Sequence, residues 1–83
     1  MRNNVVSFTL LGKTHTVTTD ENPADVQAIA DIVEEKIKKA AARRNMEPSE
    51  AFAMVAALDV AADLLKLRKD YQHIMSLAKD END

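Results

Sequence analysis

Hydrophobic and polar residues alternate with two different periods along this 83-residue chain. Between residues 5 and 19 the two types alternate at every second position, which is typical of strands that bury one face. After residue 22, apolar residues recur every three or four positions, which predicts helices. The order of these patterns predicts an α+β fold. It has an N-terminal β-hairpin over about residues 5–19, a helix over about 23–44, and a long C-terminal helix from residue 48 to about Lys79.

The hairpin pattern also predicts a register. Gly12 and Lys13 fit a two-residue turn of type II′, which needs glycine at its first central position. That turn pairs Leu11 with Thr14, Leu10 with His15, Phe8 with Val17 and Val6 with Thr19. One face then carries Val6, Phe8, Leu10, His15 and Val17, and the other carries Ser7, Thr9, Thr16 and Thr18. A two-stranded sheet is marginal alone, so we expect a helix on its apolar face.

The first helix has clear start signals, because Asn22 is a favourable N-cap residue and Pro23 suits the first helical position. Its apolar stripe consists of Val26, Ile29, Ala30, Val33, Ile37, Ala40 and Ala41. We therefore expect residues 1–47 to form a small head.

The long helix, within residues 48–83, carries a seam of small and apolar residues spaced alternately by four and three. The seam consists of Ala53, Ala57, Val60, Leu64, Leu67, Tyr71, Ile74 and Ala78. Its mean spacing of 3.5 residues keeps one stripe against a partner helix in a left-handed supercoil. We therefore expect this helix to form an oligomeric coiled coil with a second copy of the chain.

A second stripe accompanies the seam in the first half of this helix. It consists of Ala51, Val55, Leu58, Ala62 and Leu65, and it stops before Lys69. The first half is therefore apolar on two sides. We expect it to lie between the hairpin and helix of its own chain on one side and a partner on the other.

Composition excludes several classes of function. The net charge is −3, so no overall attraction draws the chain to nucleic acid or acidic lipid. The chain has no cysteine and one glycine, which leaves no thiolate metal site and no glycine-rich phosphate loop. The longest apolar run, Ala51 to Leu58, is too short to span a bilayer. We expect a cytoplasmic protein with no cofactor and no metal.

Candidate catalytic groups are few. His15 falls on the apolar face of the hairpin and His73 on an exposed shoulder of the last helix, each without a partner at metal-ligand spacing. Asp59 and Asp63 lie four residues apart, which is compatible with a metal or acid/base site. We interpret them as a solvated helix edge, with Lys66 close enough to neutralise Asp63. The sequence therefore favours a protein that is not an enzyme.

Five basic residues lie between Lys36 and Arg44. They either complement the helix dipole and aid solubility, or form a docking patch. A strand followed by two helices in a tight dimer is similar to the ribbon-helix-helix repressors, so a small dimeric DNA-binding regulator is one alternative. However, those proteins use one strand per chain. The polar face of this hairpin is rich in serine and threonine and has almost no basic residues, so it would bind a phosphate-rich groove poorly.

Two segments resemble the ZapA family of bacterial cell division proteins. The first is the hairpin Val6-Ser7-Phe8-Thr9-Leu10-Leu11-Gly12-Lys13-Thr14-His15-Thr16-Val17. The second is Ala56-Ala57-Leu58-Asp59-Val60-Ala61-Ala62-Asp63-Leu64 in the long helix. The resemblance spans about residues 4 to 75, and it is to the compact members with a short final helix.

The resemblance implies a non-enzymatic partner of FtsZ, the tubulin-like GTPase of the division ring. Family members form dimers, and often dimers of dimers, through the long helix and crosslink FtsZ filaments through their heads. The implied FtsZ-binding residues are charged and lie near the hairpin turn and the junction of the two helices. Here these positions are Lys13, Arg43, Arg44 and Glu50. The implied location is the division site in a bacterial cytoplasm.

Overall fold

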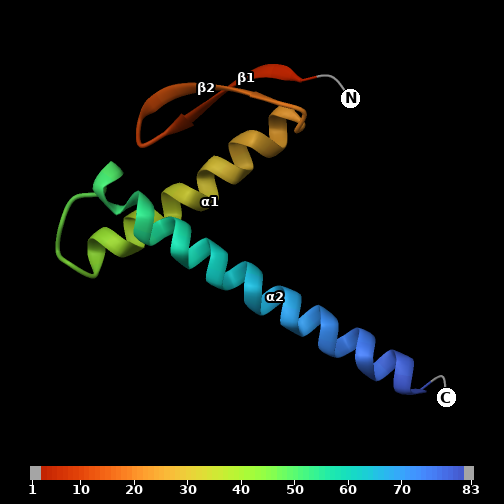
Figure 1. Cartoon of the computed structure of the whole chain (residues 1–83). Coiled ribbons are helices and arrows are strands. Elements are labelled where there is room, and N and C mark those ends of the chain that lie inside the picture. The colour runs from red at the N-terminus through yellow and green to blue at the C-terminus, as the bar shows by residue number, and fades with distance from the viewer. Residues whose placement is uncertain (1–2, 82–83) are drawn as a thin grey trace.

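A computed structural model describes residues 3–81 and confirms the α+β architecture (Figure 1). Strands β1 (Asn4–Leu10) and β2 (Lys13–Thr19) form an antiparallel two-stranded sheet that lies along one side of helix α1 (Pro23–Ala42). A 3-10 turn, η1 (Glu50–Phe52), leads into helix α2 (Ala53–Glu81). Helix α2 crosses α1 near the C-terminal end of α1 and then extends well beyond the head.

The hairpin register differs from the predicted one. Leu10 pairs with Lys13, Phe8 with His15 and Val6 with Val17, so each partner is shifted by two residues. The two central turn residues are Leu11 and Gly12, both with positive φ, of 53° and 75°. Such a pair is the type I′ turn, whose twist matches that of the strands. Because a shift of two residues preserves the side-chain period, the predicted apolar face is nevertheless correct.

Contacts with α1 explain why Leu11 accepts a conformation that branched side chains rarely adopt. The Leu11 N–H donates a 2.6 Å hydrogen bond to Oε1 of Glu34. The Leu11 side chain packs against the core around Ile37. These two contacts hold the turn one residue earlier than local preference for glycine at the first position would place it.

A glutamine of α1 fixes the open edge of β1. The N–H of Thr9 donates to Oε1 of Gln27 at 2.9 Å, and Nε2 of Gln27 donates to the carbonyl of Thr9 at 3.0 Å. Because a strand at the edge of a sheet has unpaired backbone groups, this bidentate contact satisfies both groups of one residue. The sheet is thereby anchored to α1 by polar as well as apolar contacts.

Helix α1 begins and ends as its sequence predicts, within two residues. Oδ1 of Asn22 accepts a 3.0 Å hydrogen bond from the N–H of Ala24, and Pro23 occupies the first turn. At the other end the chain leaves the helix through Asn45, whose φ is 54°, and the N–H of Met46 donates to the carbonyl of Ala41. Asparagine tolerates this left-handed conformation, which commonly ends helices.

The core is small and lies where α1 meets the start of α2. Its buried residues there are Ile37, Ala40, Ala41, Phe52 and Ala56, with Leu11 and Val33 packed against them. A second buried group, Val6, Val26 and Ala30, lies between the sheet and α1. Ile29 was expected to belong to the buried stripe of α1, but its side chain is 50% exposed. The hairpin is too narrow to cover that flank of the helix.

The line of α2 that packs on its own head was not predicted. It begins with Phe52 and Ala56, both buried, and continues to Asp59 and Asp63. With about 100° of rotation per residue, this line lies between the seam and the second stripe. The expectation that the own-chain side of α2 would be an apolar stripe is therefore wrong, and both apolar stripes remain uncovered in the single chain.

An ion triad joins the two helices. Nζ of Lys36 lies 2.7 Å from Oδ2 of Asp63 and 3.3 Å from Oδ2 of Asp59. The Asp63 side chain is 64% exposed and that of Asp59 is 33% exposed, so the two aspartates do lie on a solvent-accessible edge, but their principal partner is Lys36 on α1 instead of Lys66. They are the only charged side chains between Ala51 and Leu65. Both charges in this stretch of α2 thus contact the same cation, which balances one of the two.

The triad perturbs the ionisation of its members. Hydrogen bonds from Lys36, reinforced by its charge, hold the pKa of Asp63 below the ordinary value of 3.8. Hydrogen bonds to Asp63 and then to Asp59 raise the pKa of Lys36 above 10.5. The Asp63 contribution to stability is present above pH 3.8 and is lost as the pH falls through the lowered pKa. The Lys36 contribution is present below pH 10.5 and is lost as the pH rises through the raised pKa.

The triad predicts a specific acid dependence. We expect Asp63→Asn to lower the thermal unfolding midpoint at pH 7 and to flatten its decline below pH 3.8, because one carboxylate that favours the folded state has been removed. Asp70→Asn, which removes a carboxylate from the same helix outside the triad, is the matched control. Thermal melts between pH 2 and pH 7 at one protein concentration measure both effects. If the unfolding midpoint fell equally steeply below pH 3.8 in Asp63→Asn and in the parent, this role of Asp63 would be contradicted.

The turn yields a second prediction. Gly12→Ala should lower the free energy of unfolding by about 1–2 kcal/mol, because alanine at positive φ is strained. No other side chain lies within 4 Å of the added Cβ, so the loss is conformational and not steric. Gly12→Asn should recover most of it, since asparagine tolerates this conformation. Urea unfolding measures both variants, and equal stability of Gly12→Ala and the parent would overturn the type I′ assignment.

Candidate interaction surfaces

The predicted seam is open to solvent along α2. Leu64 is 46% exposed, and Leu67, Tyr71 and Ile74 are each more than 60% exposed. Val60 is half-buried, and Ala53, Ala57 and Ala78 are exposed. From Leu67 onward, α2 extends away from the head, so no part of the described chain covers these side chains. Large aliphatic and aromatic residues repeated along an uncovered helix are typical of a helix–helix interface.

The second stripe is equally exposed and lies almost opposite the seam. Val55, Leu58 and Leu65 are 45%, 67% and 53% exposed. The first half of α2 thus has apolar side chains on nearly every side, apart from the two aspartates that face Lys36. A helix of this kind is normally buried on more than one side. One chain buries only the line through Phe52 and Ala56.

Two of the four predicted FtsZ-binding residues lie at one cleft. Lys13, at the start of β2, and Glu50, in η1, line a hollow of about 390 Å³ together with Leu11, Pro48, Ser49 and Ala51. The hydroxyl of Ser49 accepts a 3.3 Å hydrogen bond from the N–H of Ala51 and so fixes the start of η1. The hairpin turn and the junction before α2, far apart in sequence, therefore present opposite charges around one apolar hollow.

Arg43 and Arg44 do not line this cleft, but they lie on the same side of the molecule. The hairpin turn, the end of α1 and η1 all lie at the left of Figure 1. Both arginines are exposed, and neither forms an ion pair with a residue between 3 and 81. The structure thus brings Lys13 and Glu50 together and leaves the two arginines as a neighbouring basic corner.

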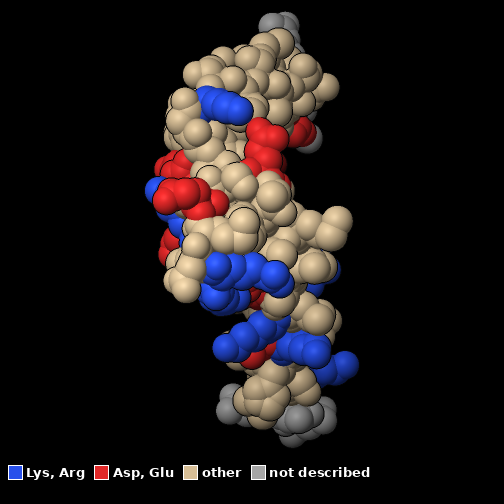
Figure 2. All heavy atoms as spheres, turned by 90° about the vertical axis from the view of Figure 1, so that its left-hand side faces the viewer, with Lys and Arg blue, Asp and Glu red and all other residues tan. Residues whose placement is uncertain are grey.

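The other members of the basic run are engaged in ion pairs. Lys36 binds the two aspartates of α2, Lys38 lies 3.4 Å from Glu34, and Lys39 lies 3.3 Å from Glu35. Figure 2, which views the side that is at the left of Figure 1, shows acidic side chains mainly in the upper part of this face and basic side chains gathered in its lower half.

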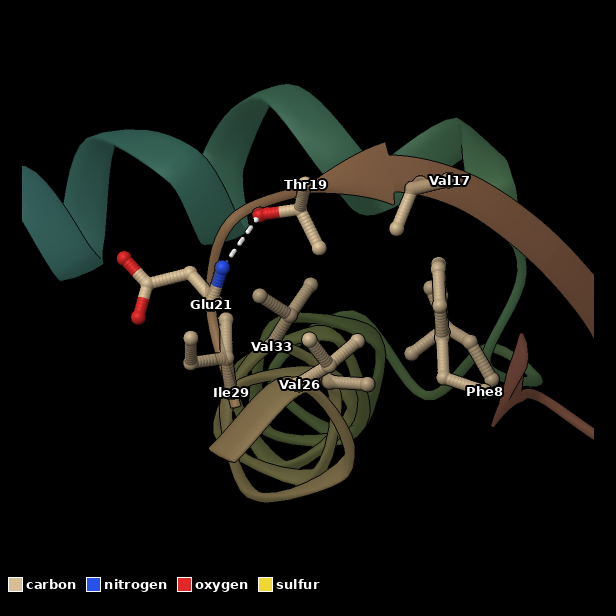
Figure 3. A pocket seen from close by; sticks show the side chains of 9 residues that line it. Phe8, Val17, Thr19, Glu21, Val26, Ile29 and Val33 are labelled. Atoms are coloured by element: carbon tan, nitrogen blue, oxygen red, sulfur yellow. Dashed lines mark hydrogen bonds between the residues drawn. The ribbon is translucent and has the colours of Figure 1, made fainter. Parts of the chain in front are cut away.

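An apolar groove lies on the head between the sheet and α1. Its volume is about 320 Å³, and its lining consists of Phe8, Leu10, Val17, Thr19, Glu21, Val26, Ile29, Ala30 and Val33. Figure 3 shows Thr19 and Val17 above α1 and Phe8 beside it, with Ile29 and Glu21 on the opposite side of the groove from Phe8. The hydroxyl of Thr19 accepts a 3.1 Å hydrogen bond from the N–H of Glu21 and holds the chain as it leaves β2.

The histidines take structural or exposed positions. His15 stacks on Phe8, with the ring centroids 5.4 Å apart and the ring planes at 24°, so it extends the apolar face of the hairpin. His73 is exposed on α2. Among residues 3–81, no three His, Asp or Glu side chains gather in a way that could hold a metal ion. No helix in the same part of the chain is long and apolar enough to cross a membrane.

Sequence reasoning missed the ion triad and the buried line through Phe52 and Ala56. A signal for the triad was present, because Asp59 and Asp63 interrupt an otherwise uncharged helical segment at a spacing that places them on one face. Isolated charges of this kind need a partner when the surrounding helix is buried. The sequence does not reveal which of the three lysines of α1 provides that partner, since this depends on how the helices cross.

Comparisons with known proteins agree with this architecture. The family model described as "Cell division protein ZapA" matches residues 6–82. The chain is 27% identical over 78 residues to the cell division protein ZapA of Geobacillus kaustophilus, which covers 94% of this chain and 86% of that protein. It is 31% identical over 61 residues to the ZapA of Shouchella clausii, covering 74% and 78% of the two chains.

The ZapA of Geobacillus thermodenitrificans is also similar, with 25% identity over 76 residues, or 92% of this chain and 84% of that protein. No solved structure gives a significant match. The family match includes nearly all of the hairpin, both helices and the junction between them. On this match the chain belongs to the ZapA family of cell division proteins.

Proposed function

We propose that this protein is a non-enzymatic accessory of bacterial cell division that binds FtsZ and crosslinks its filaments within the Z ring. The observation that carries this proposal is the uncovered seam of α2, in a member of the ZapA family. Through the seam, two chains pair and hold two heads on one rigid coiled coil. The site of action is the division site, on the cytoplasmic side of the membrane.

Crosslinking follows from symmetry. A dimer that pairs through one helix carries two identical heads, and each head binds the same repeated surface of a polymer. Once one head is bound, the second binds at a high effective concentration, so weak individual contacts produce a strong association between filaments. A tetramer, formed by two such dimers, would carry four heads. In this mechanism α2 sets the spacing between heads and provides no chemistry of its own.

The cleft between the hairpin turn and η1 is the best-supported docking position on the head. Lys13 and Glu50 supply a cation and an anion at its rim, and Leu11 and Pro48 supply apolar surface between them. Arg43 and Arg44 extend the charged rim on the same side of the molecule. Opposite charges around an apolar centre suit a protein partner with a complementary mixed surface, and they do not favour a nucleic acid.

The seam generates a prediction about assembly. Leu64→Glu and Leu67→Glu should each convert the oligomer to single chains of 9.2 kDa, because pairing would force a carboxylate into an apolar, desolvated interface. Lys69→Glu, which also introduces an acid on α2 but on the side away from the seam, is the matched control and should keep the parent mass. Light scattering at micromolar concentration measures these masses. Parent mass in both leucine variants would refute pairing through the seam.

The docking surface generates a prediction about filament binding. Lys13→Glu and Arg43→Glu should each weaken co-sedimentation with GTP-assembled FtsZ about tenfold, because reversal of a rim charge opposes the complementary partner charge. Both variants should keep the oligomeric mass and the thermal stability of the parent. Lys69→Glu, with the same change of charge outside the head, should bind normally.

Two outcomes of the pelleting experiment are decisive. Normal binding by both head variants would place the docking surface elsewhere on the molecule. Absence of binding and bundling by the parent protein, across a range of protein ratios, would refute the proposed function itself.

A further inference from the structure

The hairpin sequence is compatible with two registers. In the observed register, Leu11 and Gly12 form the turn and Leu10 pairs with Lys13. In the alternative register, Gly12 and Lys13 would form a type II′ turn and Leu11 would pair with Thr14. The partners in the two registers differ by two positions, so the same apolar residues share one face in both. The apolar pattern of the hairpin therefore does not select between the registers.

The observed register has a conformational cost that the alternative avoids. Leu11 has a φ of 53°, in the left-handed region that is unfavourable for a residue with a bulky side chain. A type II′ turn needs a positive φ only at its first central residue, which would be Gly12. Contacts from outside the hairpin must therefore offset the cost at Leu11.

Two polar side chains of α1 make contacts that only the observed register permits. Glu34 accepts a 2.6 Å hydrogen bond from the N–H of Leu11, and Gln27 binds both backbone groups of Thr9. In the alternative register, Leu11 and Thr9 would each belong to a hydrogen-bonded pair, in which the N–H groups are donated to the opposite strand. Neither N–H would then be available to α1. The carboxylate of Glu34 makes the charge-assisted and therefore stronger kind of bond.

The register also determines the position of Lys13. In the observed register Lys13 is the first residue of β2 and lines the cleft together with Glu50. Among residues 3–81, neither strand packs against η1 or α2, whereas β1 and η1 each pack against α1. The two walls of the cleft are thus attached to α1 separately. In the alternative register Lys13 would be a central residue of the turn, at the tip of the hairpin.

We propose that Glu34 is a positioning residue for the docking cleft. By binding the N–H of Leu11, it selects the register that places Lys13 at the rim of the cleft, and Gln27 supports the same register from the next two turns of α1. Glu34 does not line the cleft, so it acts through the hairpin turn. This inference rests on the proposed role of the cleft in FtsZ binding, and it adds what determines the geometry of that cleft.

The first experiment identifies the register by nuclear Overhauser contacts between Hα atoms. These contacts mark the non-hydrogen-bonded pairs of an antiparallel sheet, where the two Cα atoms are about 4.5 Å apart. In the observed register such a contact joins Thr9 and Thr14, and in the alternative it joins Leu10 and His15. We expect Glu34→Ala to gain the Leu10–His15 contact at the expense of the Thr9–Thr14 contact.

Three further variants show whether the hydrogen bond is the cause. Glu35→Ala, which removes a neighbouring glutamate that pairs with Lys39, is the matched control and should keep the parent contact. Glu34→Gln retains an acceptor and should keep it as well. Leu11→Asn, added to Glu34→Ala, should restore it, because Asn-Gly strongly favours a type I′ turn.

Three outcomes of this experiment would overturn the inference. The first is an unchanged Thr9–Thr14 contact in Glu34→Ala, with no Leu10–His15 contact. The second is loss of both contacts, because Glu34 would then maintain the hairpin without selecting its register. The third is failure of Leu11→Asn to restore the parent contact.

The second experiment tests the consequence for binding. Glu34→Ala should weaken co-sedimentation with GTP-assembled FtsZ about tenfold, and Glu35→Ala should bind normally. In the Lys13→Glu background, Glu34→Ala should change binding less than about twofold, because residues that act through one another are not additive. A full tenfold loss in that background would refute action through Lys13. Absence of binding by the parent would refute the proposed function alone, since the Hα contacts are measured without FtsZ.

Discussion

The first half of α2 carries more apolar surface than the head of one chain covers, and this imbalance governs the rest of the molecule. The own-chain contact uses a single line through Phe52 and Ala56, and Lys36 contacts both aspartates, the only charged residues between Ala51 and Leu65. The remaining faces have no polar group that would favour exposure to water. Burial of these faces against another helix would lower the free energy of α2, and this is the physical basis of the proposed pairing.

The ion triad fixes the geometry on which this association depends. Apolar contacts between alanines tolerate rotation and sliding of one helix on another, whereas a cation shared by Asp59 and Asp63 specifies both register and crossing. The triad is partly accessible to solvent, so its contribution to stability is limited by screening. It adds a directional contact to the buried packing of Phe52 and Ala56, and both place the same line of α2 toward the head. Helix α2 thereby presents its seam in a defined direction.

Much of this fold is predictable from the sequence, and the exceptions have definable physical causes. The caps at Asn22 and Ser49 and the two-residue alternation of the hairpin depend on local chemistry, so the sequence determines them. The register was wrong because the position of the turn depends on Leu11, whose contacts with Glu34 and the core are tertiary. The candidate residues Lys13 and Glu50 were identified by resemblance alone, and their position around one cleft required the fold.

The same distinction explains why a seam can be proposed from the sequence, whereas the exposed flank at Ile29 and Ile32 cannot. A seam with a spacing of 3.5 residues is a property of one helix, and its periodicity is visible without knowledge of what it contacts. Ile29 and Ile32 do not form a repeating apolar stripe that would mark them as a contact surface. They are exposed because a hairpin of only two strands does not reach them. A wider sheet would have buried them. Exposure of this flank is therefore a consequence of how few strands the head has, which no local pattern in α1 reveals.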